Sequence, residues 1–181
     1  FPYTTLFRST VSFASTGAGS ASHLTGELFA IRTNTEMLHV PYKGTGGALV
    51  DLIPGKVHIM FADATVAVPN IQGGKVQTYG TSAAKQNTLI PSVPPLAQFM
   101  PGFDWQAWQG VSVPAATPPA IVARLSAEMQ KFQQTQEFRE LLAKFGMEPW
   151  GPMSPAEFAA YVKNDMPRWA EAVRVSGAKV D

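Results

Sequence analysis

The stretch HVPYKGTGGALVDLIPGKVHIMFAD, residues 39–63, decides the fold of this chain. Two short apolar runs, each of a length typical of a strand, enclose a glycine turn and a short helix. The first run ends at Pro41, and Pro54 with Gly55 must break the helix that follows the turn. This order of strand, turn, helix and strand is typical of two parallel strands joined by a helix.

The same alternation extends on both sides of this stretch. Strands are expected at residues 10–15, 37–41, 56–61 and 75–81, with helices at 21–31, 44–55 and 64–74. The last of these helices is expected to be disturbed or ended at Pro69, which cannot donate a backbone hydrogen bond. Three alternations with short loops predict an α/β layer with a mostly parallel sheet and right-handed crossovers.

The second half of the chain has a different character. A short helix near 95–100 and a strand at 107–113 precede helices at 119–135, 136–145 and 155–176. Thr117 is the expected N-cap of the first of these helices, and Ser154 with Glu157 forms a capping box for the last. Gly146 and Gly177 stand where helices should end.

Composition excludes several classes of function. The 181 residues carry a formal net charge of +1, which gives no basic surplus for nucleic acid. There is no cysteine, so disulfides, thiolate catalysis and cysteine-held metals are excluded. No apolar run approaches the roughly 20 residues of a membrane span.

The first nine residues, FPYTTLFRS, match the translation of a widely used sequencing-library adapter, residue for residue. We therefore expect residues 1–9 to be an artefact and exclude them from the fold. The native sequence is then expected to begin near Thr10, inside a longer gene.

No catalytic or metal-binding set stands out. His39 and His58 fall inside predicted strands, where a packed or edge histidine is expected over a catalytic one. Ser20, His23 and Asp63 could be assembled into a triad, but almost any sequence permits that. We expect no catalytic residue, no metal site and no cofactor.

Two glycine loops could meet a ligand. In YKGTGGALV, Lys43 precedes the glycines, so the loop is not a nucleotide-binding P-loop, and the glycines could serve only the turn. In ASTGAGSASH, residues 14–23, hydroxyls and glycines alternate between a strand and a helix. Such loops lie at the same sheet edge and offer neutral donors, which suits a carboxylate. A Ser/Gly-rich cap without a ligand is the alternative.

Five segments in this order resemble the Bug family, the extracytoplasmic solute-binding proteins of tripartite tricarboxylate transporters. They are SFASTGAGSASHLTGELF (12–29), HVPYKGTGGALVDLIPGKVHIMF (39–61), SVPPLAQFMPGF (92–103), VSVPAATPPAIVARLSAEMQK (111–131) and GMEPWGPMSPAEFAAYV (146–162). The resemblance extends from about Val11 to Asp181.

The resemblance implies a two-lobed periplasmic binding protein of the second type, in which hinge closure encloses the ligand. It implies a small organic acid as ligand and membrane permease subunits as partners. It also implies that the protein has no catalytic activity and is a monomer when complete. Residues 10–113 would form the second, ligand-binding α/β lobe, and residues 114–181 would return to a first lobe that is mostly missing here, with the export signal. One lobe alone offers one wall of a cleft, so weak binding is expected.

The resemblance also implies the ligand-binding residues. They are Ser15, Thr16, Gly17, Gly19, Ser20, His23, Tyr42, Lys43, Gly44 and Asp63. The sequence departs from the family pattern in four places: Ala62 separates Phe61 from Asp63, TGGALV (45–50) replaces the usual PAL-D, His58 replaces an aspartate, and Thr16 replaces a common serine. The first three departures put the role of Asp63 and the pocket lining in question.

Three questions stay open at this stage. The large apolar residues of the tail, among them Trp150, Phe158 and Trp169, could cover the α/β lobe or belong to the missing one. A small α/β enzyme acting on an anionic substrate is the alternative function, and it would need a positioned acid/base pair. A structural module with Ser/Gly caps is the third possibility.

Overall fold

The computed structural model describes residues 11–178. The proposed adapter residues 1–9 lie outside this range. The elements in chain order are β1 (Val11–Ser15), α1 (Ala21–Thr33), β2 (Met37–Pro41), α2 (Thr45–Leu52), β3 (Ile59–Met60), α3 (Ala64–Gln72), the 3₁₀ helix η2 (Leu96–Gln98), α4 (Pro119–Gln133), α5 (Gln136–Lys144) and α6 (Pro155–Ser176).

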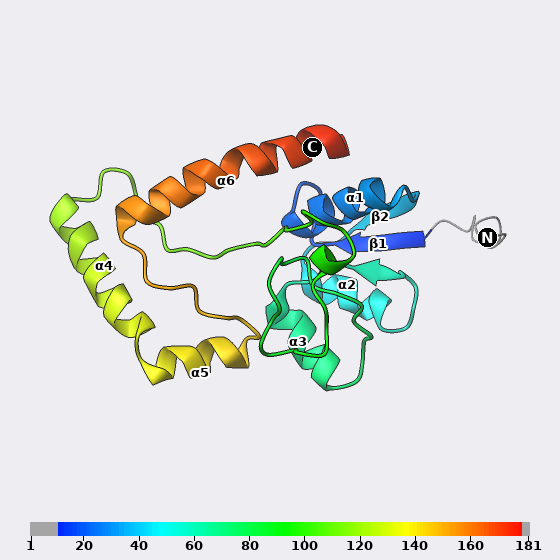
Figure 1. The fold of residues 1–181 in the computed structure, drawn as a ribbon, viewed down its shortest axis with the longest axis horizontal. Coiled ribbons are helices and arrows are strands. Elements are labelled where there is room, and N and C mark those ends of the chain that lie inside the picture. Colours follow the sequence, from blue (N-terminus) through cyan, green and yellow to red (C-terminus); the bar gives the residue numbers. More distant parts are fainter. Residues whose placement is uncertain (1–10, 179–181) are drawn as a thin grey trace.

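The three strands form one parallel sheet in the order β2-β1-β3 (Figure 1). Phe13 of β1 pairs with His39 on one side and with Ile59 on the other. The predicted α/β class and parallel sheet are therefore confirmed.

Side chains of β1 alternate between the two faces of the sheet, as a strand requires. Phe13 is fully buried and lies under α1, where Gly26 leaves room for its ring. Ala14 points the other way and forms a small core with Ala48 of α2 and Val57. Both faces of the central strand are thus covered, which explains why residues 12–15, two serines among them, are all buried.

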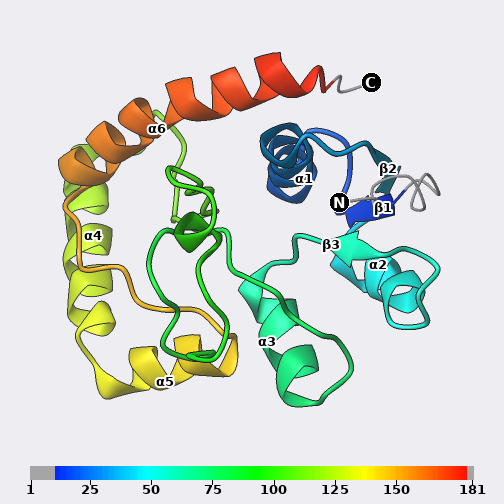
Figure 2. The ribbon, with the colours of Figure 1, turned by 45° about the vertical axis from the view of Figure 1, so that its right-hand side comes forward.

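A further layer lies outside α1. Leu28 of α1, Phe103 and Ala172 of α6 form a second buried cluster, so α1 lies between the sheet and the C-terminal half of α6 (Figure 2). Asp165 of α6 anchors this layer because the indole nitrogens of Trp108 and Trp169 both donate to its Oδ2, at 3.0 and 2.9 Å.

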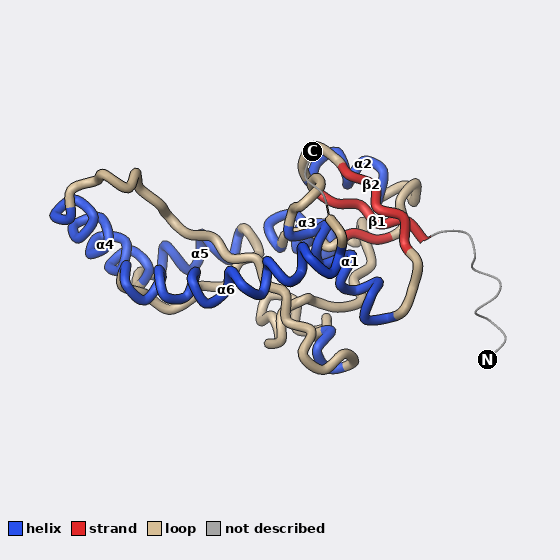
Figure 3. The backbone as a smooth tube through the Cα atoms, turned by 90° about the horizontal axis from the view of Figure 1, so that it is seen from above, coloured by secondary structure: helices blue, strands red, loops and turns tan. Residues whose placement is uncertain are grey.

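Helices α4, α5 and the first half of α6 extend away from the sheet (Figures 1 and 3). The irregular segment around 104–118 leads from the α/β part to α4, and a second irregular segment at 145–154 connects α5 to α6. Glu148 in the second segment accepts a hydrogen bond from the Thr88 amide at 2.9 Å. The chain thus consists of a packed α/β part and a protruding helical part.

The predicted strand at 75–81 is wrong. Only Thr81 pairs, in an isolated bridge to Pro95, with its amide donating to the Pro94 carbonyl. The partner segment carries two consecutive prolines, which have no N–H to extend a ladder. The alternating apolar pattern here therefore does not become a strand.

The predicted strand at 107–113 is also wrong. Trp108 packs edge-on against Phe158 and Tyr161 of α6, and Gly110 lies close against the Phe158 ring. The apolar pattern of this segment reflects packing on α6, which needs no ladder of backbone hydrogen bonds.

Several predicted element boundaries need smaller corrections. β3 is only Ile59–Met60 because the amides of Lys56 and Val57 donate to the Asp51 carbonyl behind α2. Pro69 does not end α3, which continues to Gln72.

The helix caps are mostly as predicted. Pro118, not Thr117, is the N-cap of α4, whereas the capping box of Ser154 and Glu157 is confirmed. Gly146 follows the end of α5 and Gly177 caps α6, both with positive φ, as predicted.

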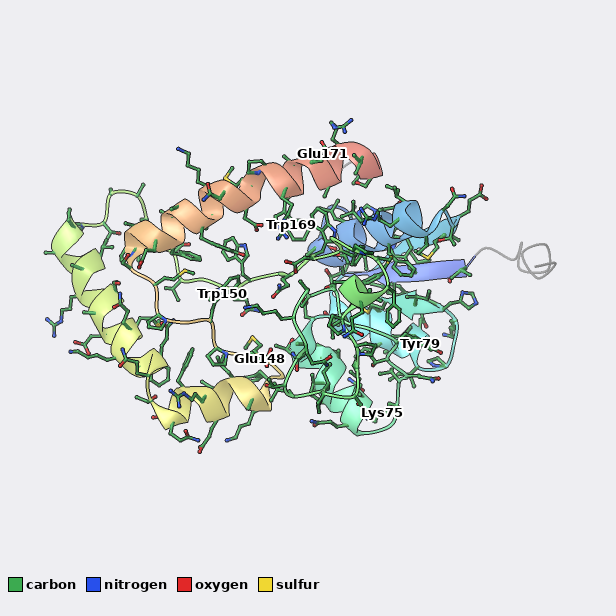
Figure 4. All side chains as sticks on the ribbon, in the orientation of Figure 1. Lys75, Tyr79, Glu148, Trp150, Trp169 and Glu171 are labelled. Carbon is green, nitrogen blue, oxygen red and sulfur yellow. The ribbon has the colours of Figure 1, made fainter. Side chains whose placement is uncertain are left out.

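Some large apolar residues of the tail cover the α/β part, and others stay exposed. Trp169 packs edge-on against Trp105 in the second cluster, and Phe158 packs against Trp108. Trp150 contacts Tyr161 but stays 51% exposed (Figure 4). The tail therefore covers part of the α/β lobe and leaves other apolar surface open.

Candidate ligand-binding edge of the sheet

The loops that follow the three strands meet at one edge of the sheet. The Tyr42 amide after β2 donates to the carbonyl of Ser15 at the end of β1, at 3.0 Å. The Gly44 amide donates to the Thr16 carbonyl at 3.4 Å. Asp63 follows β3 as the N-cap of α3, and its exposed side chain makes no capping bond. The predicted neighbourhood of the first two loops therefore exists, because carboxyl ends of parallel strands share an edge.

The loop at residues 15–20, called the α1 loop below, uses most of its own donors internally. The amides of Thr16, Gly17 and Gly19 donate to Ser22 Oγ, Ser15 Oγ and His23 Nδ1, at 2.9, 3.1 and 3.0 Å. The Ser20 hydroxyl donates to the Gly17 carbonyl at 2.7 Å. The predicted site residues of this loop are thus brought together, but their groups mainly fix the shape of the loop.

Other amides are left for a ligand. Among the described residues, the backbone amides of Ala18, Ala21 and Ser22 have no hydrogen-bond partner. Ala21 and Ser22 are the first residues of α1, where intrahelical partners do not exist and the helix dipole is positive. These three donors were not predicted as site residues; the position of Ser20 as N-cap was the signal that could have indicated them.

His23 and His39 lie behind the α1 loop. Their rings stack with centroids 3.7 Å apart at an interplanar angle of 11°. His39 Nε2 lies 2.6 Å from Ser15 Oγ, and His23 Nε2 lies 3.5 Å from Glu27 Oε1. Burial, with a smaller contribution from the charge of His23, lowers the pKa of His39 from 6.5 to about 4. His23 is buried, so it supports the loop from behind.

The Ser15–His39 pair has the distance of a nucleophile and its base, but the surroundings are those of a structural pair. Ser15 is 0% exposed, and its hydroxyl also bonds to Gly17. Within residues 11–178 no carboxylate is hydrogen-bonded to His39 to orient it. The alternative triad does not assemble either, because His23 Nδ1 accepts from Gly19.

The loop after β2 is fixed by α2 and its C-terminal turn. The Tyr42 hydroxyl donates to Asp51 Oδ2 at 3.0 Å, and Lys56 Nζ lies 2.9 Å from Asp51 Oδ1. These two hydrogen bonds, from Lys56 first, lower the pKa of Asp51. The side chain of Lys43 is exposed, and no ion pair engages it within the described range. Lys43 is therefore available to attract an anion toward this edge.

Other kinds of site find no support among residues 11–178. No group of three or more histidine, aspartate or glutamate side chains is placed to hold a metal ion. The helices of this range include none with the length and apolar character of a membrane span. Two surface depressions lie along α4.

The sequence model of the tripartite tricarboxylate transporter family receptor matches residues 3–177. A curated relative, the UPF0065 protein in the tcbD-tcbE intergenic region of Pseudomonas sp. (strain P51), is 35% identical over 165 residues. That alignment covers 90% of this chain and 49% of the relative.

Solved structures show the same fold. R. palustris Rpa4515 with adipate has a TM-score of 0.86 at 28% identity, covering 93% of this chain and 56% of the other. MatC from Rhodopseudomonas palustris with bound malate has a TM-score of 0.76 at 30% identity, covering 90% and 56%. The periplasmic binding protein BugD has a TM-score of 0.79 at 29% identity, covering 93% and 57%. The chain thus spans about half the length of the relative and somewhat more than half of each structure.

Proposed function

This chain belongs to the tripartite tricarboxylate transporter family of receptors, and from that premise we propose that it supplies one wall of a periplasmic binding site for a small carboxylic acid. The ligand would be captured, not converted, and passed to membrane permease subunits. Support for the ligand class comes from the related structures that hold adipate and malate.

The observation that carries this proposal is the set of free amides at the start of α1. The amides of Ala18, Ala21 and Ser22 stand at the positive end of a helix of 13 residues. A carboxylate accepts several such hydrogen bonds at once, and these charge-assisted bonds are stronger than neutral ones. The predicted site residues of the α1 loop keep these donors in place, and Lys43 adds a positive charge nearby.

The helical part has a separate role in this proposal. Large apolar side chains stay exposed along α4 and α5, among them Ile121, Leu125, Phe132 and Phe145. Apolar surface of this extent is typical of an interaction site. We propose that the open apolar surface of residues 114–181 packs against a further lobe of the receptor, which would provide the opposite wall of the cleft.

Calorimetric titration with malate and adipate, separately, tests the ligand class. The sharpest variant is Ala21→Pro, which removes one free amide at the first position of α1. Proline is favoured at this position, and the extended backbone of Ser20, at φ −68° and ψ 160°, suits a residue before proline. Loss of one hydrogen bond to a charged group should weaken binding by about tenfold or more.

Gln136→Pro is the matched control, because it places proline at the first position of α5, away from the sheet edge. We expect it to leave the affinity unchanged. The proposal is wrong if the folded chain, and the chain extended to the full length of its relatives, give no heat with either dicarboxylate. It is also wrong if both proline variants weaken binding equally.

A further inference from the structure

We infer that His23 and His39 are positioning residues, a stacked pair that holds the α1 loop in the shape in which its free amides face the ligand. This inference rests on the proposed carboxylate site for its purpose. The contacts on which it stands are independent of any ligand.

The pair contacts both ends of the loop. At the start, His39 Nε2 lies 2.6 Å from Ser15 Oγ, and that hydroxyl also accepts the Gly17 amide. Near the end, His23 Nδ1 accepts the Gly19 amide at 3.0 Å. The stacked rings join these two contacts, and Phe13 continues the stack beneath His39, with ring centroids 5.0 Å apart.

The loop needs such support because its backbone is permissive. Gly17 and Gly19 have φ values of 138° and 74°, which other residues rarely adopt. Glycines lose more conformational freedom on ordering than other residues, so the loop is costly to fix. A ligand that met a disordered loop would have to supply that ordering free energy itself, with a loss of affinity.

The contact with Gly19 fixes which nitrogen of His23 carries a proton. The Gly19 amide is a donor, so His23 Nδ1 must carry no proton, which leaves the proton on Nε2, toward Glu27 Oε1. The groups that face His39 are Phe13 and Ser15 from β1 and His23 from α1, with Glu27 beyond His23. Of these only Glu27 is acidic, and no bond joins it directly to His39.

Acid therefore acts on the pair through His39, whose pKa of about 4 reflects burial and the nearby His23. Above that pH the His39 ring carries no charge. Below it, a partly desolvated positive charge on His39 would lie against a second imidazole, and the stack and both loop contacts should loosen. Ligand capture is then expected to fail in strong acid while remaining intact near neutral pH.

Nuclear magnetic resonance of the full 181-residue chain provides a test that needs no ligand. The Gly19 amide shift and the ring shifts of His39 are followed from about pH 7 downward, with circular dichroism at each step to confirm folding. We expect both to move together with a midpoint near pH 4. His39→Gln, which can still bond to Ser15 but does not titrate, should keep the neutral-pH shift of Gly19 and abolish the transition.

His39→Ala should displace the Gly19 shift already at neutral pH and speed its hydrogen exchange severalfold. His58→Gln is the matched control: this exposed histidine bonds to Ser12, not to the α1 loop, and its loss should change neither readout. The inference is overturned if His39→Ala leaves the chemical shift and the hydrogen exchange of the Gly19 amide unchanged at neutral pH. It is also overturned if the Gly19 transition survives in His39→Gln.

Titration of malate and adipate into the same variants separates the two proposals. If neither ligand binds the wild-type chain at any pH, the proposed function fails, and the Gly19 readout still decides the role of the pair. If binding occurs but is equal in wild type and His39→Ala at neutral pH, the positioning role fails and the carboxylate site stands.

Discussion

His23 of α1 and His39 of β2 lie ring on ring, with centroids 3.7 Å apart. The contact joins a helix to an edge strand directly behind the loop that connects β1 to α1. The lowered pKa of His39 follows from this placement, because a charge there would be both desolvated and close to a second imidazole. A partly desolvated histidine in such a contact makes the local fold sensitive to acid.

The first prediction concerns stability against pH. The pKa of His39 is about 4 in the folded chain and near 6.5 when unfolded, so the unfolded chain binds more protons between these values. The free energy of unfolding should therefore fall as the pH decreases from about 6.5 to about 4. Urea unfolding across this range measures the slope, which should be shallower in His39→Gln. Equal slopes in the wild-type chain and His39→Gln would contradict this.

The second prediction concerns Lys43. Its exposed charge near the α1 loop should attract a dicarboxylate, so Lys43→Gln should weaken malate or adipate binding severalfold at low salt. The difference should shrink as salt screens the charge. Lys75→Gln makes the same change of charge beyond α3, away from the edge, and serves as control (Figure 4). Calorimetric titration at two salt concentrations measures the affinity of each variant. If both substitutions weaken binding equally, Lys43 acts only through the net charge of the chain.

The third prediction compares two glycines. A methyl group at Gly26 of α1 would overlap the ring of Phe13, whereas one at Gly46 of α2 would meet nothing within 4 Å. Gly26→Ala should therefore destabilise the chain by about 1–3 kcal/mol through overpacking, despite the better helix propensity of alanine. Gly46→Ala should stabilise it by roughly 0.5–1 kcal/mol. Chemical denaturation measures the free energy of unfolding of both variants. If both substitutions change it in the same direction, α1 packs less closely on the sheet than described.

The fourth prediction concerns Asp165, which is buried and accepts from Trp108, Trp169 and Arg168. Asp165→Asn keeps the shape but removes the charge that Arg168 meets and turns one oxygen into a donor. We expect a loss of roughly 2–3 kcal/mol, since hydrogen bonds to charged groups are involved. Urea unfolding, monitored by tryptophan fluorescence, measures this loss of unfolding free energy.

Glu171→Gln is the control for Asp165, because it breaks an exposed pair with Arg174 on the same helix. Exposed pairs contribute little, so the unfolding midpoint should stay where it is. If the two variants behave alike, Asp165 does not anchor α6 to the α/β part.

Local sequence patterns were sufficient for most elements and failed for two. The bounds of β2 and α6 agree with the prediction because Pro41 ends the strand and the capping box of Ser154 begins the helix. The segments at 75–81 and 107–113 have strand-like composition but join no strand in the described range, apart from the isolated bridge of Thr81 to Pro95. Strand formation depends on a second chain segment with free donors, and the pattern of one segment does not report it.

For the site, the sequence indicated the right loops but not which of their groups are available. Ser20 and the glycines locate the loop at the start of α1, and the family resemblance indicates a carboxylate. The use of Gly17 and Gly19 amides inside the loop, and the freedom of Ala21 and Ser22, are matters of hydrogen-bond geometry.

The sequence by itself therefore determined the class of fold, the order of strand and helix, and the family. Those features depend on local signals such as spacing, prolines and caps, which act within a few residues along the chain. Only the tertiary structure decided that His39 of a predicted strand would stack on His23 of a predicted helix. Burial, which lowers the pKa of His39, exists only when β1, β2 and α1 come together, because desolvation depends on residues distant in sequence.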